Sequence, residues 1–434
     1  MKRTDDQTTD MDAKQYFLNL VQRQKSGFED GICSICSANA FVIEAAMEFG
    51  LEQKCAVLVE ATANQVNQYG GYTGMQPADF AAYVQSLAQK VGLPMEQLIL
   101  GGDHLGPLTW SAEPEADAMA KAEVLIDAFV RAGFRKIHLD TSMRLKDDPQ
   151  DQPLTDETIA RRAARLCAVA ERAAKSGEEP VYVVGSEVPI PGGATENEDA
   201  LAITPPENLD ATLEAFRKAF HDKELDEAFK RVIAVVVQPG VEFADNTIIV
   251  YDSEKAKRLT NHAKALPFVL EGHSTDYQPT SALRAMRRDG IAILKVGPAL
   301  TFALREALFA LESMERDLYA FSPVGGYSRF SDVLEQKLMQ EPKYWERYYH
   351  GTEGDLAFAR RYSLSDRCRY YLEDDTIKQS IGRLLANINA KPLPFGLTSQ
   401  YFPAQKEAIL AKNGGVNAQW LIKERIRDVI KTYY

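Results

Sequence analysis

Short apolar runs alternate with longer amphipathic segments along the chain up to about residue 320. The short runs are rich in β-branched residues, which is typical of strands, and the longer segments carry apolar residues at a spacing of three to four, which is typical of helices. Each run is followed by one helical segment. The eight runs are GICSICS (31–37), AVLVEAT (56–62), LILGGDH (98–104), KIHLDTS (136–142), VYVVGSE (181–187), VIAVVVQPG (232–240), FVLEGHS (268–274) and IAILKVG (291–297).

Eight strand–helix units in succession predict an α/β protein with a closed (β/α)8 barrel, the TIM-barrel architecture. An open doubly wound sheet is less favoured, because its first strand usually leads into a glycine-rich nucleotide turn, and here that strand runs into CSANAF. We expect an N-terminal segment over residues 1–25, the barrel over 26–320, and a helical C-terminal region over 321–434 that packs on the barrel.

The C-terminal region contains two clusters of aromatic residues, KYWERYYH (343–350) and RCRYYL (367–372). Packing of these rings against the barrel is the favoured interpretation. A subunit interface is the alternative, because Tyr and Trp are enriched where proteins meet. Such an interface would make the protein a homo-oligomer.

The chain has 434 residues, of which 45% are hydrophobic and 26% charged, and its formal net charge is −12. This composition excludes wholesale disorder, and the acidic balance argues against a nucleic-acid surface, which needs a concentrated basic face. The longest apolar runs are of strand length, so no membrane span is expected, and the polar first residues lack the apolar core of a signal peptide. We expect a cytoplasmic protein without a disulfide framework, since it has only five cysteines.

Polar residues gather at the ends of the predicted strands, where barrels of this kind carry their chemistry. In the fourth run Lys136, His138 and Asp140 share one face, which we expect to point into the barrel. Glu271 and His273 share a face in the same way. The polar residues at the strand ends are Cys36, Glu60, Asp103, His104, Asp140, Ser142, Glu187, Gln238, Glu271, His273 and Lys295.

Two histidines and several carboxylates at one mouth indicate a site for a divalent metal ion. Zinc is the first candidate, because neutral imidazole suits Zn²⁺ and a carboxylate can complete its shell. The predicted ligands are His104 and His273, and the alternative is that both are buried, hydrogen-bonded histidines. His138 is less favoured because it lies deeper in its strand. The three other histidines fall on helical or connecting segments.

Three further features have ordinary explanations beside chemical ones. Cys33 and Cys36 form a CxxC pattern, but it lies within a strand and has no second pair, so small residues filling the barrel interior are favoured. Lys295 could form a Schiff base, although a phosphate-binding or ion-paired lysine is favoured. The glycine-rich turns QYGGYTG (68–74) and PGGATE (191–196) are either phosphate-binding loops or ordinary connections.

Ten longer motifs share a common resemblance. They are GICSICSANAFVIEAA, LVEATANQVNQYGGYTGM, LGGDHLGP, KIHLDTSM, SEVPIPGG, VVVQPGVEF, EGHSTDYQ, ILKVGPALTFALREALFAL, SLSDRCRYY and LTSQYFP. From about Gly31 to about Pro403 the chain resembles the large accessory subunit of D-tagatose-1,6-bisphosphate aldolase. The resemblance implies a TIM barrel related to the class II, zinc-dependent aldolases. It also implies support for the activity and stability of a smaller catalytic subunit in tagatose 6-phosphate, galactitol or N-acetylgalactosamine catabolism.

The more distant likeness to the catalytic class II aldolases implies roles for single positions. Asp103-His104 resembles their Asp-His pair, in which Asp acts in proton transfer and His binds zinc, and His273 resembles a later zinc-binding His. Two departures weaken the likeness: Gln238 stands where those enzymes carry another zinc His, and Gly-Pro (297–298) stands where they carry an Asn. Because an amide oxygen is a poor zinc donor beside imidazole, we expect weaker metal binding.

The same likeness extends to residues around the substrate. Asp140 and Ser142 lie in a segment similar to the Asp-x-Ser strand end, and Glu187 ahead of Gly192-Gly193 resembles the Glu before a Gly-Gly loop. The expected site residues are Asp103 and Glu187 for catalysis, His104, Glu187 and His273 as ligands of zinc or another divalent metal, and Asp140, Ser142, Gly192, Gly193, Gln238, Ser274 and Lys295 for substrate binding.

Functions of different classes remain open. The first is an accessory subunit, weak or inactive alone, that binds a catalytic class II aldolase subunit and keeps a relict site. The alternative is an autonomous metal-dependent aldolase or epimerase that acts on a ketose or ketose phosphate. A barrel adapted to an unrelated substrate is the third, since one barrel supports many chemistries. The sequence contains neither a P-loop nor the glycine signature of sugar kinases, so a kinase is not expected.

Overall fold

The computed structural model describes residues 12–149, 151–185, 201–321, 325–412 and 414–434. Its centre is a closed barrel of eight parallel strands, as the alternating pattern predicted. The strands pair in the order β1-β10-β9-β6-β5-β4-β3-β2, and β2 closes the ring on β1. They are β1 (Ile32–Ile35), β2 (Val57–Thr62), β3 (Leu98–Leu105), β4 (Lys136–Leu139), β5 (Val181–Val184), β6 (Val232–Val237), β9 (Val269–Gly272) and β10 (Ile291–Val296).

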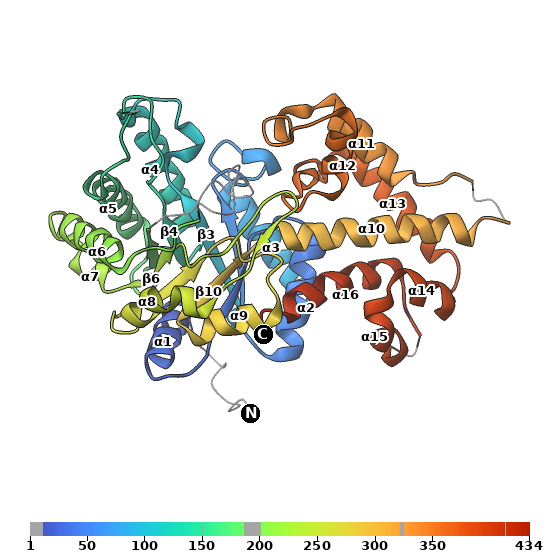
Figure 1. Cartoon of the computed structure of the whole chain (residues 1–434), viewed down its shortest axis with the longest axis horizontal. Helices are drawn as coiled ribbons and strands as arrows, with labels where there is room; N and C mark the ends of the chain where they lie inside the picture. The colour runs from blue at the N-terminus through green and yellow to red at the C-terminus, as the bar shows by residue number, and fades with distance from the viewer. Residues whose placement is uncertain (1–11, 150, 186–200, 322–324, 413) are drawn as a thin grey trace.

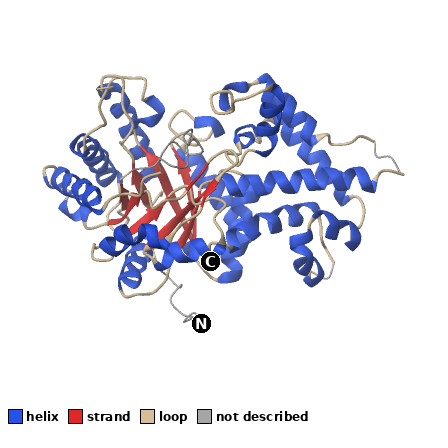
Figure 2. Cartoon of the chain, viewed as in Figure 1, coloured by secondary structure: helices blue, strands red, loops and turns tan. Residues whose placement is uncertain are grey.

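Helices cover the outside of the barrel (Figure 2). Their apolar side chains recur at three-to-four spacing, and in α5 the side chains of Ala163, Leu166 and Ala170 are fully buried. A short helix, α7 (Asp226–Phe229), and a hairpin of β7 (Glu242–Phe243) and β8 (Ile248–Ile249) lie in the connections. The outer helices are α2 (Ala40–Gln53), α3 (Pro77–Val91), α4 (Glu115–Arg131), α5 (Asp156–Ala173), α6 (Pro206–His221), α8 (Ser253–Ala263), α9 (Thr280–Arg288) and α10 (Pro298–Leu318).

A further helix, α1 (Ala13–Lys25), closes the N-terminal end of the barrel. Lys14 forms an ion pair with Glu179, just before β5, at 2.9 Å. The buried side chains Phe17, Leu20 and Val21 join a cluster of apolar residues from the barrel strands, so this end of the barrel has an apolar plug. The strand residues of that cluster include Ile32, Leu58, Ile99, Val181, Val183, Ile233, Val236, Val269 and Ile293.

A buried ion cluster crosses the middle of the barrel. Lys136 Nζ lies 2.8 Å from Glu60 Oε1 and 2.9 Å from Glu271 Oε2, and none of the three side chains is exposed. Ser34 donates from Oγ to the same Glu60 carboxylate. Gly101 pairs with Lys136 in the ladder, and the Glu60 side chain fills the space that a Cβ at Gly101 would need. The polar face of the fourth strand therefore points inward, as predicted, and its charge is paired.

The C-terminal region is helical and packs on α10 and α2 at one side of the barrel (Figure 1). The last helix of the region contacts both α10 and α2. The C-terminal end of the chain therefore lies against the first and the last of the helices that surround the barrel. The helices of the region are α11 (Phe330–Gln340), α12 (Glu353–Tyr362), α13 (Asp375–Asn389), α14 (Phe395–Tyr401), α15 (Lys406–Ala411) and α16 (Ala418–Lys431).

The aromatic clusters of this region pack inside the protein. Tyr344 stacks on Tyr370 with ring centroids 4.9 Å apart, and Trp345 and Tyr371 are buried. Tyr72, from the loop after β2, meets Tyr370 edge-on at 4.9 Å. The rings therefore join the region to the barrel loops, in line with the packing interpretation of the sequence.

Candidate metal centre

Four polar side chains meet at the C-terminal mouth of the barrel. Asp103 and His104 lie near the end of β3, His138 lies in β4, and His273 follows β9. The ring centroid of His104 is 4.8 Å from that of His273 and 5.0 Å from that of His138. One donor atom from each of the four residues lies within 4.8 Å of the others, and all four are buried. The group is a candidate metal centre.

The backbone turns sharply at His104. Its φ of 47° is in the left-handed region, and the pairing of β3 with β4 shifts register between Gly102 and Leu105. With this backbone, Nδ1 of the ring lies 2.7 Å from Oδ2 of Asp140. Burial alone would raise the pKa of Asp140, but the hydrogen bond and charge of His104 hold that pKa well below its ordinary value. Ser142 donates to Asp140 from its N and Oγ, at 3.1 and 2.8 Å.

His273 is held by a carboxylate in a similar way. Its Nε2 lies 2.9 Å from Oε1 of Glu271. Burial, followed by the charge of Lys295, lowers the pKa of His273 to about 3, so this imidazole is neutral at physiological pH. Among the described residues, neither Nε2 of His104 nor Nδ1 of His273 has a hydrogen-bond partner. Each ring thus has one nitrogen fixed by a carboxylate and the other open, which is typical of metal-binding histidines.

His138 belongs to the group, although its depth in the strand disfavoured it as a predicted ligand. Its Nδ1 accepts from the N–H of His104 at 3.2 Å and lies 3.1 Å from Oδ1 of Asp103, while its Nε2 lies 3.0 Å from the carbonyl oxygen of Gly185. Both ring nitrogens are therefore engaged. The signal that would have found it is the shared inward face of His138 and Asp140.

Asp103 contacts most members of the cluster. Its Oδ2 forms an ion pair with Lys295 and lies 3.9 Å from Nε2 of His104, and Cys36 Sγ approaches the same oxygen at 3.8 Å. Burial raises the pKa of Asp103, but the charges of His104 and Lys295 hold it well below its ordinary value. Lys295 is thus an ion-paired lysine, which is one of the two roles favoured from the sequence.

The donor set fits a divalent metal ion. Two imidazole nitrogens and one carboxylate oxygen converge, and two His with one carboxylate form a known catalytic zinc set. The open nitrogens of His104 and His273 are buried polar atoms that a metal ion would satisfy. The ammonium of Lys295 on Asp103 is the one feature that opposes it.

The remaining predicted site residues have other roles or lie outside the described residues. Oε1 of Gln238 accepts from the N–H groups of Gly240 and Val241 at 2.9 and 3.0 Å, so the amide holds its own turn. Ser274 has a φ of 51° and follows His273 directly. Glu187, Gly192 and Gly193 lie outside the described residues.

A residue that sequence reasoning missed is Asp276, in the loop after β9. Its Oδ1 accepts from the N–H groups of Gly297 and Ala299, at 3.0 and 2.8 Å, where α10 begins. The start of α10 is thus capped by a carboxylate from the loop after β9.

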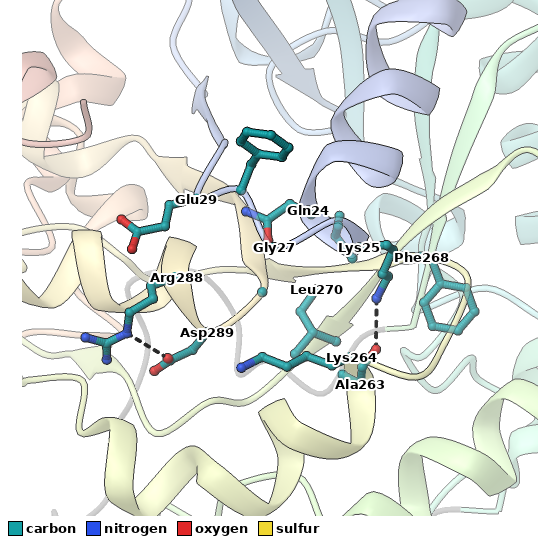
Figure 3. A pocket seen from close by; sticks show the side chains of 13 residues that line it. Gln24, Lys25, Gly27, Glu29, Ala263, Lys264, Phe268, Leu270, Arg288 and Asp289 are labelled. Atoms are coloured by element: carbon teal, nitrogen blue, oxygen red, sulfur yellow. Dashed lines mark hydrogen bonds and ion pairs between the residues drawn. The ribbon is translucent and has the colours of Figure 1, made fainter. Parts of the chain in front are cut away.

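A cavity of about 280 Å³ lies at the opposite end of the barrel (Figure 3). Lys25 donates from Nζ to the carbonyl oxygen of Ala263 at 2.9 Å across it, and Arg288 pairs with Asp289 at 3.2 Å (Figure 3). No histidine lines this cavity in the described structure, so it is separate from the candidate metal centre. None of the described helices is long and apolar enough to cross a membrane.

The fold and the mouth define a (β/α)8-barrel protein with a buried His and Asp cluster at the C-terminal ends of its strands. The chain belongs to the D-tagatose-1,6-bisphosphate aldolase subunit GatZ/KbaZ-like family, whose model matches residues 17–434. This confirms the resemblance found in the sequence motifs.

Individual relatives agree with the family. A D-tagatose-1,6-bisphosphate aldolase subunit GatZ from Klebsiella pneumoniae is 49% identical over 417 residues, which are 96% of this chain and 97% of that protein. The subunit GatZ of Salmonella dublin is 49% identical over 416 residues, 95% of this chain and 97% of that protein. A crystal structure of a probable tagatose 6 phosphate kinase from Sinorhizobium meliloti is 41% identical, with a TM-score of 0.85 over 93% of this chain and 99% of that one.

Proposed function

We propose that this chain is a subunit of a D-tagatose-1,6-bisphosphate aldolase that supports the activity and stability of a class II catalytic subunit. The observation that carries the proposal is 49% identity to proteins named as that subunit, over nearly the whole of both chains. We place the complex in the cytoplasm, in the catabolism of tagatose 6-phosphate, galactitol or N-acetylgalactosamine.

The residues at the mouth would hold a zinc ion through Nε2 of His104, Nδ1 of His273 and a carboxylate oxygen of Asp103. When bound, zinc acts as a Lewis acid that polarises a carbonyl oxygen. Asp140 and Glu271 keep the two rings in position through their outer nitrogens.

Two features favour weak activity of the chain alone. Gln238 is an amide where a catalytic relative carries an imidazole, and its oxygen is already bonded to its own turn. The start of α10, where a catalytic relative would place a polar contact to substrate, is capped by Asp276. At both places the side chain binds backbone N–H groups of this chain, so it offers no group to metal or substrate.

The test compares aldolase activity of the catalytic subunit alone, of this chain alone, and of the two together on tagatose 1,6-bisphosphate, with release of triose phosphate measured by a coupled assay. We expect complex formation on size-exclusion chromatography and a longer half-life and higher rate for the catalytic subunit in the complex. This chain alone should turn over far more slowly than about 1 per second, an ordinary enzymatic rate.

The matched variant is the double substitution His104→Ala/His273→Ala. An accessory subunit with this variant mouth should support its partner as well as the wild-type chain does, provided that the variant is folded. Loss of that support would contradict the accessory role, and so would metal-dependent turnover by the wild-type chain alone at an ordinary rate.

A second candidate function is favoured by the two carboxylate–imidazole pairs. Carboxylates orient the rings of both His104 and His273 so that one nitrogen of each stays open. Such an arrangement is expected of a working metal site and not of a relict one. An autonomous metal-dependent aldolase or epimerase that acts on a ketose or ketose phosphate accounts for that arrangement. Partner-free turnover that is lost in His104→Ala/His273→Ala would establish it.

A further inference from the structure

We propose that the ammonium of Lys295 and a divalent metal ion compete for Asp103, so that Lys295 sets the metal affinity of the barrel mouth. The proposal rests on the metal-holding role of His104, His273 and Asp103 given under the proposed function. It does not depend on whether the chain acts as an accessory subunit or as an enzyme.

The mouth offers two open imidazole nitrogens to a metal ion, which needs further ligands beside them. The outer nitrogens of His104 and His273 are held by Asp140 and Glu271 at 2.7 and 2.9 Å. The inner nitrogens, Nε2 and Nδ1, are buried and have no hydrogen-bond partner among the described residues. A metal ion on these two nitrogens needs an oxygen ligand beside them, and Asp103 is the carboxylate in that group.

The carboxylate oxygen of Asp103 that faces His104 already has a partner. Oδ1 of Asp103 lies 3.1 Å from Nδ1 of His138 and is engaged there. Oδ2 lies 3.9 Å from the open Nε2 of His104 and is therefore the oxygen placed for a shared ion. That same Oδ2 forms the ion pair with Lys295.

The ammonium of Lys295 and a divalent ion would repel each other at Asp103. Asp103 is fully buried and Lys295 is 8% exposed, so water screens little of the repulsion between an ammonium and a divalent ion on one oxygen. A lysine has a flexible four-carbon stem and can swing away from its partner. Metal binding would therefore displace the ammonium from Asp103. Once displaced, Lys295 is a free cation at the mouth, where it can hold an anionic group of a ligand.

The experiment measures the zinc affinity of the full chain, stripped of metal and then titrated against a chromophoric zinc chelator. In Lys295→Met we expect the affinity to rise at least about tenfold, because the competing charge is gone. Lys264→Met is the matched control, since Lys264 is exposed and lines the cavity at the other end of the barrel. Its affinity should equal that of the wild-type chain.

A second variant pair tests the oxygen itself. Adding Asp103→Asn to Lys295→Met should remove the gain, and Lys295→Gln repeats the test with a polar residue if the methionine variant fails to fold. Equal or weaker zinc binding in the Lys295 variants would overturn the proposal, and so would a gain that survives Asp103→Asn or an absence of zinc binding in every variant. Aldolase assays with the catalytic subunit are not involved, so failure here is separate from failure of the proposed function.

Discussion

The carboxyl group of Asp276 lies where α10 begins, at a place where barrels of this kind often bind phosphate. Helix N-terminal N–H groups attract anions, and here those of Gly297 and Ala299 already donate to Oδ1 of Asp276. The carboxylate thus takes the place that a phosphate oxygen would occupy. Any phosphate of a ligand would have to bind elsewhere at the mouth, or displace Asp276.

This carboxylate should make stability depend on pH. Burial raises the pKa of Asp276 to about 6 from an ordinary value of 3.8, so the folded protein keeps a proton that the unfolded chain releases. Its stabilising contribution is present below pH 3.8 and is lost as the pH rises through 6. Asp276→Asn keeps an acceptor and carries no charge, so it should match the wild-type chain near pH 4 and exceed it by up to about 3 kcal/mol near pH 7.5. Thermal midpoints of the two proteins across this range provide the measurement, and parallel curves would contradict the prediction.

Gln238 is a second residue whose side chain accepts from backbone N–H groups, here those of its own turn. Gln238→His removes the acceptor for the N–H groups of Gly240 and Val241, and we expect a loss of about 1–2 kcal/mol in stability. Gln238→Glu, which keeps an oxygen at that position, is the control and should lose less. Zinc affinity should stay unchanged in Gln238→His, because the side chain is directed at the turn. A clear gain in zinc affinity would show instead that this position faces the metal site.

Residues of the mouth could be predicted from the sequence where strand position alone decides their place. His104 and His273 converge because both lie at the C-terminal ends of barrel strands, and parallel strands bring these ends to one level. The orientation of Gln238 and the capping role of Asp276 could not be predicted, since they depend on the path of the loops. The depth of His138 within its strand argues against a place at the mouth, and only its inward face indicates that it joins the cluster.

At the scale of elements, the C-terminal segment is tied to the loop that carries His273. Tyr433, fully buried near the end of the chain, donates from its hydroxyl to the carbonyl oxygen of Thr275 at 2.9 Å. Thr275 in turn donates from Oγ1 to the carbonyl oxygen of Lys295 at 2.6 Å. The C-terminal segment, the β9–α9 loop and the end of β10 are therefore linked in one chain of hydrogen bonds.

This link predicts that Tyr433→Phe costs about 1 kcal/mol, because the buried carbonyl of Thr275 loses its donor. Tyr401→Phe is the control: its hydroxyl donates to Asp317 on the surface at 2.8 Å, and the cost should lie within about 0.5 kcal/mol. Thermal denaturation of both variants measures the difference. Equal midpoints for the two would show that the link at Thr275 contributes nothing.

The strands were easier to predict than the helices that close the structure. Most barrel strands are short apolar runs rich in β-branched residues, and this local signal with the alternation of strands and helices suffices for the barrel. The plug formed by α1 and the seating of α16 on α2 and α10 are tertiary contacts. No local pattern distinguishes a helix that closes a barrel from one that lies on its outside.

Across the whole molecule, the barrel separates two ends with different chemistry. The mouth holds His104, His273 and Asp103, and the opposite end is filled by apolar residues that include Phe17. Between them, Lys136 pairs with two buried carboxylates in the middle of the barrel. This charged layer lies between the two ends, so stability and metal binding should respond to different substitutions.

Phe17→Ala tests this separation. Phe17 is fully buried, and a buried Phe→Ala change costs about 3–5 kcal/mol, so the thermal midpoint should fall substantially. The adjacent Leu18 is 36% exposed, and Leu18→Ala should change stability by no more than about 0.5 kcal/mol. Measured well below its midpoint, folded Phe17→Ala should bind zinc as the wild-type chain does, because the ion layer at Lys136 and the strand ends above it are unchanged. A parallel loss of zinc affinity in the folded variant would mean that the plug positions the mouth, and that the two ends of the barrel act as one unit.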